Sequence, residues 1–196
     1  MRILNLLIFI SLSTSAQQSY IDYVSPYHPV VGKSGMVVSQ NNLSSDIGIE
    51  ILNKGGNAVD AAVAVGFSLA ITLPRAGNLG GGGFMLVYLK ERDEIFYIDY
   101  RSKSPLNASI DNIFDLNGKT IKPKDFTNDM FNKTRYGYKA PAIPGTVAGL
   151  LEAHENFGKL PLGEVLAPAI RQARNGIKVS YDLEKAIEDT HQLKKD

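Results

Sequence analysis

The stretch that most constrains the fold of this chain covers residues 53–83 and reads NKGGNAVDAAVAVGFSLAITLPRAGNLGGGG. Between its two glycine clusters, residues 58–73 are almost wholly apolar, with Asp60 as their only charge. A helix that is apolar on all sides belongs in the interior of a packed domain. The stretch therefore predicts a buried helix that Asn57 caps and Pro74 stops.

Four consecutive glycines, Gly80 to Gly83, come directly before an apolar strand pattern. Because glycine has no Cβ, such a run predicts a tight turn where bulk is excluded or unusual dihedrals are needed. A phosphate-binding loop does not fit, since no Gly-Lys-Ser/Thr follows and the next element is a strand. The apolar helix before the run is also shorter than the roughly 20 residues that a membrane span requires.

The N-terminus has the pattern of a secretory signal peptide. Residues 1–16 read MRILNLLIFISLSTSA: one basic residue, an apolar run and then small residues. We expect cleavage after Ala16, which would leave residues 17–196 as a secreted or periplasmic protein without a membrane attachment.

Composition narrows the possible functions. The chain has 196 residues, 44% of them hydrophobic, which is enough for one domain with a real core. Its formal charge is +1, and it falls to 0 once Arg2 is removed with the signal peptide, so nothing indicates nucleic-acid binding. There is no cysteine, and Gly158 stands where a helical zinc motif starting at His154 would need its second histidine. We expect no metal and no cofactor, and no G-x-S-x-G nucleophile motif is present.

Hydrophobic periodicity predicts a mixed α and β chain. The expected helices are a first one closed by Gly55, then 58–73, 147–157, 162–175 and 182–195, and the expected strands are 36–39, 84–90 and 95–100. The last two strands form a hairpin, and both faces of its first strand are apolar, which predicts a sheet that is covered on both sides. Thr146 can cap the 147–157 helix, Pro168 predicts a kink or break, and residues 102–140 are rich in loops.

Several of these segments together resemble the γ-glutamyltranspeptidases. The matching residues are GGNAVDAAVA at 55–64, Pro74, AGNLGGGGFM at 76–85, Asp99-Tyr100-Arg101, and PGTVAG at 144–149, all in the family's order. The resemblance covers roughly residues 30–180. It implies an α+β fold of the N-terminal nucleophile hydrolase type, with a four-layer αββα core that is incomplete in this chain.

The resemblance also implies an enzyme that forms from a self-cleaving precursor. The new N-terminal threonine of the small subunit is the nucleophile in such enzymes, and its own α-amine can serve as the base. Residues 17–196 would be the N-terminal portion of the large subunit, so no catalytic residue is expected among them. The implied partners are glutathione and other γ-glutamyl compounds, acceptor amino acids or peptides, and the protein's own small subunit.

Arg101 is the substrate-binding residue that the resemblance implies. Family members use an arginine here to bind the α-carboxylate of the γ-glutamyl group, a task that suits a planar guanidinium with two parallel donors. An alternative is that Arg101 only pairs with Asp99, two residues earlier. Many members have glutamate after the arginine, whereas Ser102 follows it here.

Two other functions remain open at this level. A β-lactam side-chain acylase of the same superfamily would also use Arg101, because a glutaryl group carries a carboxylate too. A non-catalytic binding or decoy subunit is the third possibility, and the reading frame beyond Asp196 would distinguish it from an enzyme precursor.

Overall fold

A computed structural model describes residues 30–106 and 140–189 of the chain. By its contacts the chain divides into residues 1–34 and residues 35–196, and the second unit contains every described helix and strand. These elements are α1 (Asn42–Asn53), α2 (Ala58–Thr72), β1 (Phe84–Leu89), β2 (Glu94–Asp99), α4 (Thr146–Phe157), α5 (Leu162–Asn175) and α6 (Tyr181–Asp189). The expected signal peptide, residues 1–16, lies outside the described residues.

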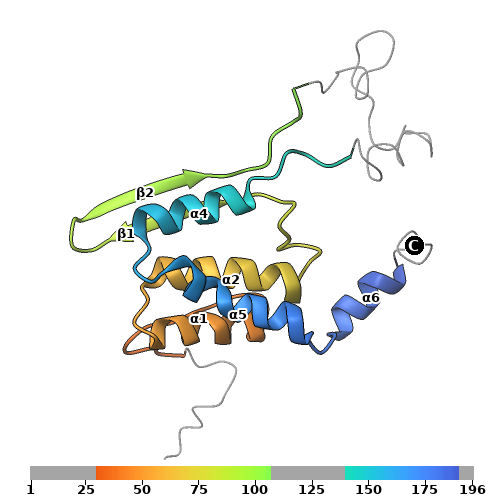
Figure 1. Cartoon of the computed structure of the whole chain (residues 1–196), viewed down its shortest axis with the longest axis horizontal. Helices are drawn as coiled ribbons and strands as arrows, with labels where there is room; N and C mark the ends of the chain where they lie inside the picture. The colour runs from red at the N-terminus through yellow and green to blue at the C-terminus, as the bar shows by residue number, and fades with distance from the viewer. Residues whose placement is uncertain (1–29, 107–139, 190–196) are drawn as a thin grey trace, which may run out of the picture. The chain divides into compact units, whose positions relative to one another are not determined.

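Helix α2 is the central helix of this unit. It contacts α1, α4 and α5, and it lies between α1 and α4 (Figure 1). Val63 and Ala64 are fully buried, and a Cβ placed on Gly66 would lie 2.8 Å from a methyl carbon of Leu150 in α4. The predicted buried helix with closely packed neighbours is confirmed. In the described ranges no helix combines the length and apolarity that crossing a bilayer requires.

Ser68 and Thr72 of α2 are buried in a chain of hydroxyl groups that sequence analysis missed. Ser44 Oγ of α1 lies 2.8 Å from Thr72 Oγ1 and 2.7 Å from Ser68 Oγ, and Ser68 donates to Gln172 of α5 at 2.7 Å. Ser68 gives its proton to Gln172, so Ser44 donates to Ser68, and the single Thr72 proton serves both Ser44 Oγ and the Ser68 carbonyl oxygen at 3.2 Å. The chain thus joins α1, α2 and α5 inside an apolar core.

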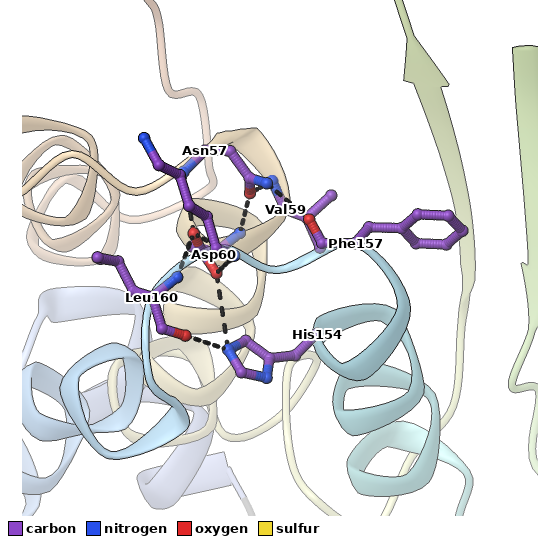
Figure 2. A network of polar contacts seen from close by, with 7 residues as sticks. Asn57, Val59, Asp60, His154, Phe157 and Leu160 are labelled. Carbon is purple, nitrogen blue, oxygen red and sulfur yellow. Dashed lines mark hydrogen bonds and ion pairs between the residues drawn. The ribbon is translucent and has the colours of Figure 1, made fainter. Parts of the chain in front are cut away.

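Asp60 is fully buried at the start of α2, and backbone N–H groups surround its carboxylate (Figure 2). Asn57 and Asp60 form a capping box, in which Asp60 accepts from the Asn57 N–H at 2.9 Å. Asp60 also accepts from the N–H groups of Lys159 at 3.0 Å and Leu160 at 3.2 Å, just beyond α4. His154 Nε2 lies 2.8 Å from the Leu160 carbonyl, which can only accept, so this nitrogen carries the hydrogen. The sole charge of α2 therefore connects two helices through their ends.

The hairpin packs against the helices on only one of its faces. Phe84 pairs with Asp99 and Leu89 with Glu94 in an antiparallel register. The inner face joins the core, and the Phe96 ring lies 4.8 Å from the Phe157 ring of α4, centroid to centroid. The outer face carries five large apolar or aromatic residues that are between 51% and 72% exposed: Phe84, Leu86, Tyr88, Ile95 and Tyr97. Among the described residues, helices cover the inner face alone, so the second covering layer that the sequence predicts is not found there.

Three further expectations differ from the structure. Residues 36–39 do not form a strand, because Val37 packs against the core beside Gly48 of α1 and no described strand pairs with the segment. Thr146 is the first residue of α4 rather than its cap; the cap position is Gly145, without a side-chain bond. Pro168 does not break α5, which runs through it with the proline buried.

The other helix ends agree with the sequence. Gly55 follows the end of α1 with a φ of 88°, a conformation that favours glycine, and Gly158 and Gly176 close α4 and α5. The last expected helix is confirmed over Tyr181–Asp189, and its expected remainder, residues 190–195, lies outside the described residues, as do residues 107–139 of the loop-rich stretch.

The glycine run forms a turn in which neighbouring residues leave no room for larger side chains at Gly82 and Gly83. None of the four has a positive φ, so unusual dihedrals are not the reason for them. Instead, a Cβ on Gly82 would collide with the backbone nitrogen of Ser102 and lie 2.7 Å from the Tyr100 carbonyl oxygen. A Cβ on Gly83 would lie 2.8 Å from the Tyr100 ring. The run lets the end of β2 approach this closely.

We predict that Asp60→Asn lowers the free energy of unfolding of the complete protein by about 2–4 kcal/mol, because one amide oxygen cannot satisfy all the buried donors. Urea unfolding followed by circular dichroism measures this loss. Glu50→Gln is the matched control: Glu50 is partly exposed and pairs with Lys54 and Arg171, so its loss should be below about 1 kcal/mol. Equal, small losses in both variants would contradict the assignment.

We predict that Gly82→Ala lowers stability by about 1–3 kcal/mol, because the new methyl meets backbone atoms that cannot move independently. Gly81→Ala, one residue earlier, should be tolerated, since its methyl would lie 3.5 Å or more from its nearest neighbours. Calorimetric melting of the two variants of the complete protein makes the comparison. Identical melting temperatures would show that the close approach at Gly82 is not a real constraint.

Candidate functional site

Arg101 lies where the polypeptide leaves the hairpin, two residues after the end of β2. Its side chain is exposed, and its guanidinium carbon lies 5.9 Å from the centre of the Phe84 ring, on the outer face. This distance is within the range of a cation–π contact. The guanidinium is therefore on the hairpin face that the described helices leave open.

Arg101 and Asp99 do not form the side-chain ion pair that the alternative interpretation of Arg101 requires. Asp99 accepts from the backbone N–H of Arg101 at 3.0 Å, and not from its guanidinium. Within residues 30–106 and 140–189, no carboxylate lies at ion-pair distance from Arg101. The guanidinium donors are thus available for an anionic ligand as far as the described residues are concerned.

The backbone around Arg101 is fixed where three segments meet, residues 81–83, 100–103 and 143–146, which we call the junction. Tyr100 and Gly83 exchange backbone hydrogen bonds of 3.1 and 3.3 Å, and Lys103 exchanges bonds of 3.1 and 2.8 Å with Ile143. Arg101 lies between these two paired positions. Its backbone is consequently bonded on both sides although its side chain is exposed.

The junction also determines where α4 begins. The Gly81 carbonyl accepts from the N–H groups of Gly145 at 2.9 Å and Thr146 at 3.2 Å. These are among the N–H groups that a helix start leaves without an intrahelical partner, and no side chain caps them here. The glycine run therefore caps α4 with a backbone oxygen.

Tyr100 points away from Arg101, toward α4, and packs against glycines. A Cβ on Gly149 would collide with the tyrosine ring, and one on Gly145 would collide with its carbonyl oxygen. Burial raises the pKa of the Tyr100 hydroxyl above its usual value, because a phenolate would lose hydration there. Sequence analysis did not single out two residues of the candidate site, Tyr100 and Phe84. The alternation of β2, continued by one residue, could have indicated Tyr100, and the pairing of Phe84 with Asp99 could have indicated Phe84.

The histidines and carboxylates do not come together as a metal centre in the described part of the chain. No group of three or more potential ligands is found there. His154 instead belongs to the Asp60 network.

Comparisons with known proteins agree with these features. The family model described as Gamma-glutamyltranspeptidase matches residues 44–196. The chain is 44% identical over 154 residues to the "Glutathione hydrolase proenzyme" of Escherichia coli (strain K12), covering 79% of this chain and 25% of that protein. It is 39% identical over 168 residues to the "Acylase ACY 1 proenzyme" of Pseudomonas sp. (strain V22), covering 86% of this chain and 29% of the acylase.

A solved structure shows the same fold. The crystal structure of Helicobacter pylori γ-glutamyltranspeptidase aligns with a TM-score of 0.73 at 36% identity, over 84% of this chain and 44% of that one. The chain spans about a quarter of the length of the curated relatives it matches. The expected α+β fold of the N-terminal nucleophile hydrolase type is confirmed. On the match over residues 44–196 and on these relatives, the chain belongs to the γ-glutamyltranspeptidase family.

Proposed function

We propose that the complete protein transfers the γ-glutamyl group of glutathione and related compounds to water, amino acids or peptides. The nucleophile would be a threonine that self-cleavage exposes at the start of a small subunit, beyond Asp196. Its oxygen would attack the γ-carbonyl carbon, and the departing amine would take the proton that the threonine hydroxyl gives up. Residues 17–196 would contribute to the large subunit.

The observation that carries this proposal is the position of Arg101. Its guanidinium lies beside the outer face and has no carboxylate partner among the described residues, while the junction bonds its backbone on both sides. A planar guanidinium on a backbone that is held in this way suits two parallel hydrogen bonds to one carboxylate. The α-carboxylate of a γ-glutamyl group is such a ligand.

The exposed outer face supports a larger assembly around this site. Five large apolar or aromatic side chains are open to solvent there, and the matched relatives are about four times as long as the part they share with this chain. We propose that the missing layers of the αββα core cover this face. Substrate would then bind at the rim of the hairpin, where Arg101 lies.

An acylase is the second candidate, because the Pseudomonas relative of that name is 39% identical over 86% of this chain. A glutaryl group lacks only the α-amine of a γ-glutamyl group, so Arg101 suits both. The distinction is therefore expected to depend on how the rest of the protein recognises the amine.

The proposed location is outside the cytoplasm, secreted or periplasmic. Its support is the signal-peptide pattern of residues 1–16. N-terminal sequencing of the mature protein tests the location together with cleavage after Ala16.

We predict that the complete precursor cleaves itself and then releases chromophore from a γ-glutamyl anilide faster than from the glutaryl anilide. Chromophore absorbance follows both reactions, and gel electrophoresis confirms maturation. Faster release from the glutaryl compound would favour the acylase. No release from either compound after confirmed self-cleavage would favour a non-catalytic protein.

We predict that Arg101→Ala weakens the use of γ-glutamyl substrates by roughly 10- to 100-fold, mostly in KM, because a charged hydrogen-bonding partner is lost. Arg101→Lys should fall in between, since it keeps the charge but loses the planar fork. Self-cleavage should be spared in both, because it involves no substrate carboxylate. Steady-state kinetics of the matured variants decide the matter, and unchanged constants in Arg101→Ala would remove Arg101 from the site.

A further inference from the structure

The Tyr100 side chain is closely packed next to the proposed carboxylate site. It precedes Arg101 directly, and its half-buried ring lies between the glycine run and the first turns of α4. The ring is so close to Gly83 and Gly149 that a Cβ on either glycine would overlap it. No larger residue at these two positions would leave the ring in place.

The main chain of Tyr100 is restricted in the same way. Its carbonyl oxygen accepts from the Gly83 N–H at 3.3 Å, and a Cβ on Gly82 would approach that oxygen to 2.7 Å. Gly145 borders the same oxygen from the start of α4. Ring and carbonyl together determine where the Cα of Arg101 lies.

We infer that Tyr100 is a positioning residue for substrate binding: its ring, packed between Gly83 and Gly149, sets the location from which Arg101 reaches the carboxylate. This inference rests on the proposed function of Arg101. Two parallel hydrogen bonds tolerate little displacement, and an error of about 1 Å in a binding group can reduce the rate about 100-fold. A side chain that packs loosely at position 100 would permit such an error.

The rigid ring, and not the hydroxyl group, performs this task. No hydrogen bond of the Tyr100 hydroxyl is found among the described residues, and Gly83 borders both that oxygen and the ring edge. Phenylalanine fills the same space except for one atom. Leucine and methionine are apolar but flexible or smaller, so they test the ring itself.

The test uses the complete matured enzyme and two chromogenic anilides, γ-glutamyl and 4-aminobutanoyl, which differ only in the α-carboxylate. We expect Tyr100→Leu to raise KM for the γ-glutamyl compound about tenfold, equivalent to a loss of about 1.4 kcal/mol, with little change in kcat. The preference for γ-glutamyl over 4-aminobutanoyl, as a ratio of kcat/KM, should fall by a similar factor. Tyr100→Phe should keep the wild-type values, and Tyr100→Met should show the same changes as Tyr100→Leu.

Several results with these variants would overturn the positioning role of Tyr100. An unchanged substrate preference in Tyr100→Leu, or an equal loss for both compounds, would overturn the positioning role. Failure of both the leucine and methionine variants to mature would overturn it too, since Tyr100 would then be a general core residue. Arg101→Ala, measured with the same two compounds, separates the two claims: if it retains the preference, the carboxylate-binding role of Arg101 fails first.

Discussion

The close approach of three backbone segments at the junction is the constraint on which the rest of the site depends. It is possible because Gly82 and Gly145 have no Cβ, where a methyl group would meet the Tyr100 carbonyl oxygen. The Gly81 carbonyl then accepts backbone hydrogen bonds from Gly145 and Thr146, and Gly83 exchanges two with Tyr100, so the three segments are joined. Among the described residues, the position of Arg101 depends on steric exclusion and main-chain bonds and not on a side-chain ion pair.

Helix α4 connects this junction to the core. Its first N–H groups bond to the Gly81 carbonyl, and the residues just after its end bond to the buried Asp60 carboxylate of α2. The hairpin and the central helix thus restrain the same helix at opposite ends. Tyr100 packs against the α4 side, while Arg101 extends to the face that the described helices leave open.

Local sequence patterns predicted most of the helices because caps and glycines mark their ends. Asn57 and Gly55 are examples, and both perform the expected role. The strand expected at 36–39 was wrong because a short apolar run does not show whether a partner strand exists; Val37 packs on helices instead. The hydroxyl chain around Ser44 was missed because its bonds join residues that are up to 104 positions apart in the sequence.

The site itself was only partly predictable. The family resemblance singled out Arg101 as a candidate, but the sequence does not show what lies against a glycine run, so the contacts of Tyr100 and Phe84 could not be predicted. The same limit applies to the outer face, whose alternating apolar residues indicated burial that the described helices do not provide. Local patterns report which residues prefer to be covered, and only tertiary contacts report what covers them.

A crystal structure of the complete matured protein with a bound γ-glutamyl compound would show directly whether Arg101 binds the α-carboxylate. We expect two guanidinium nitrogens of Arg101 at about 2.7–2.9 Å from the α-carboxylate oxygens, with the Tyr100 ring still packed between Gly83 and Gly149. A carboxylate bound by other cations, with Arg101 directed into solvent, would contradict it.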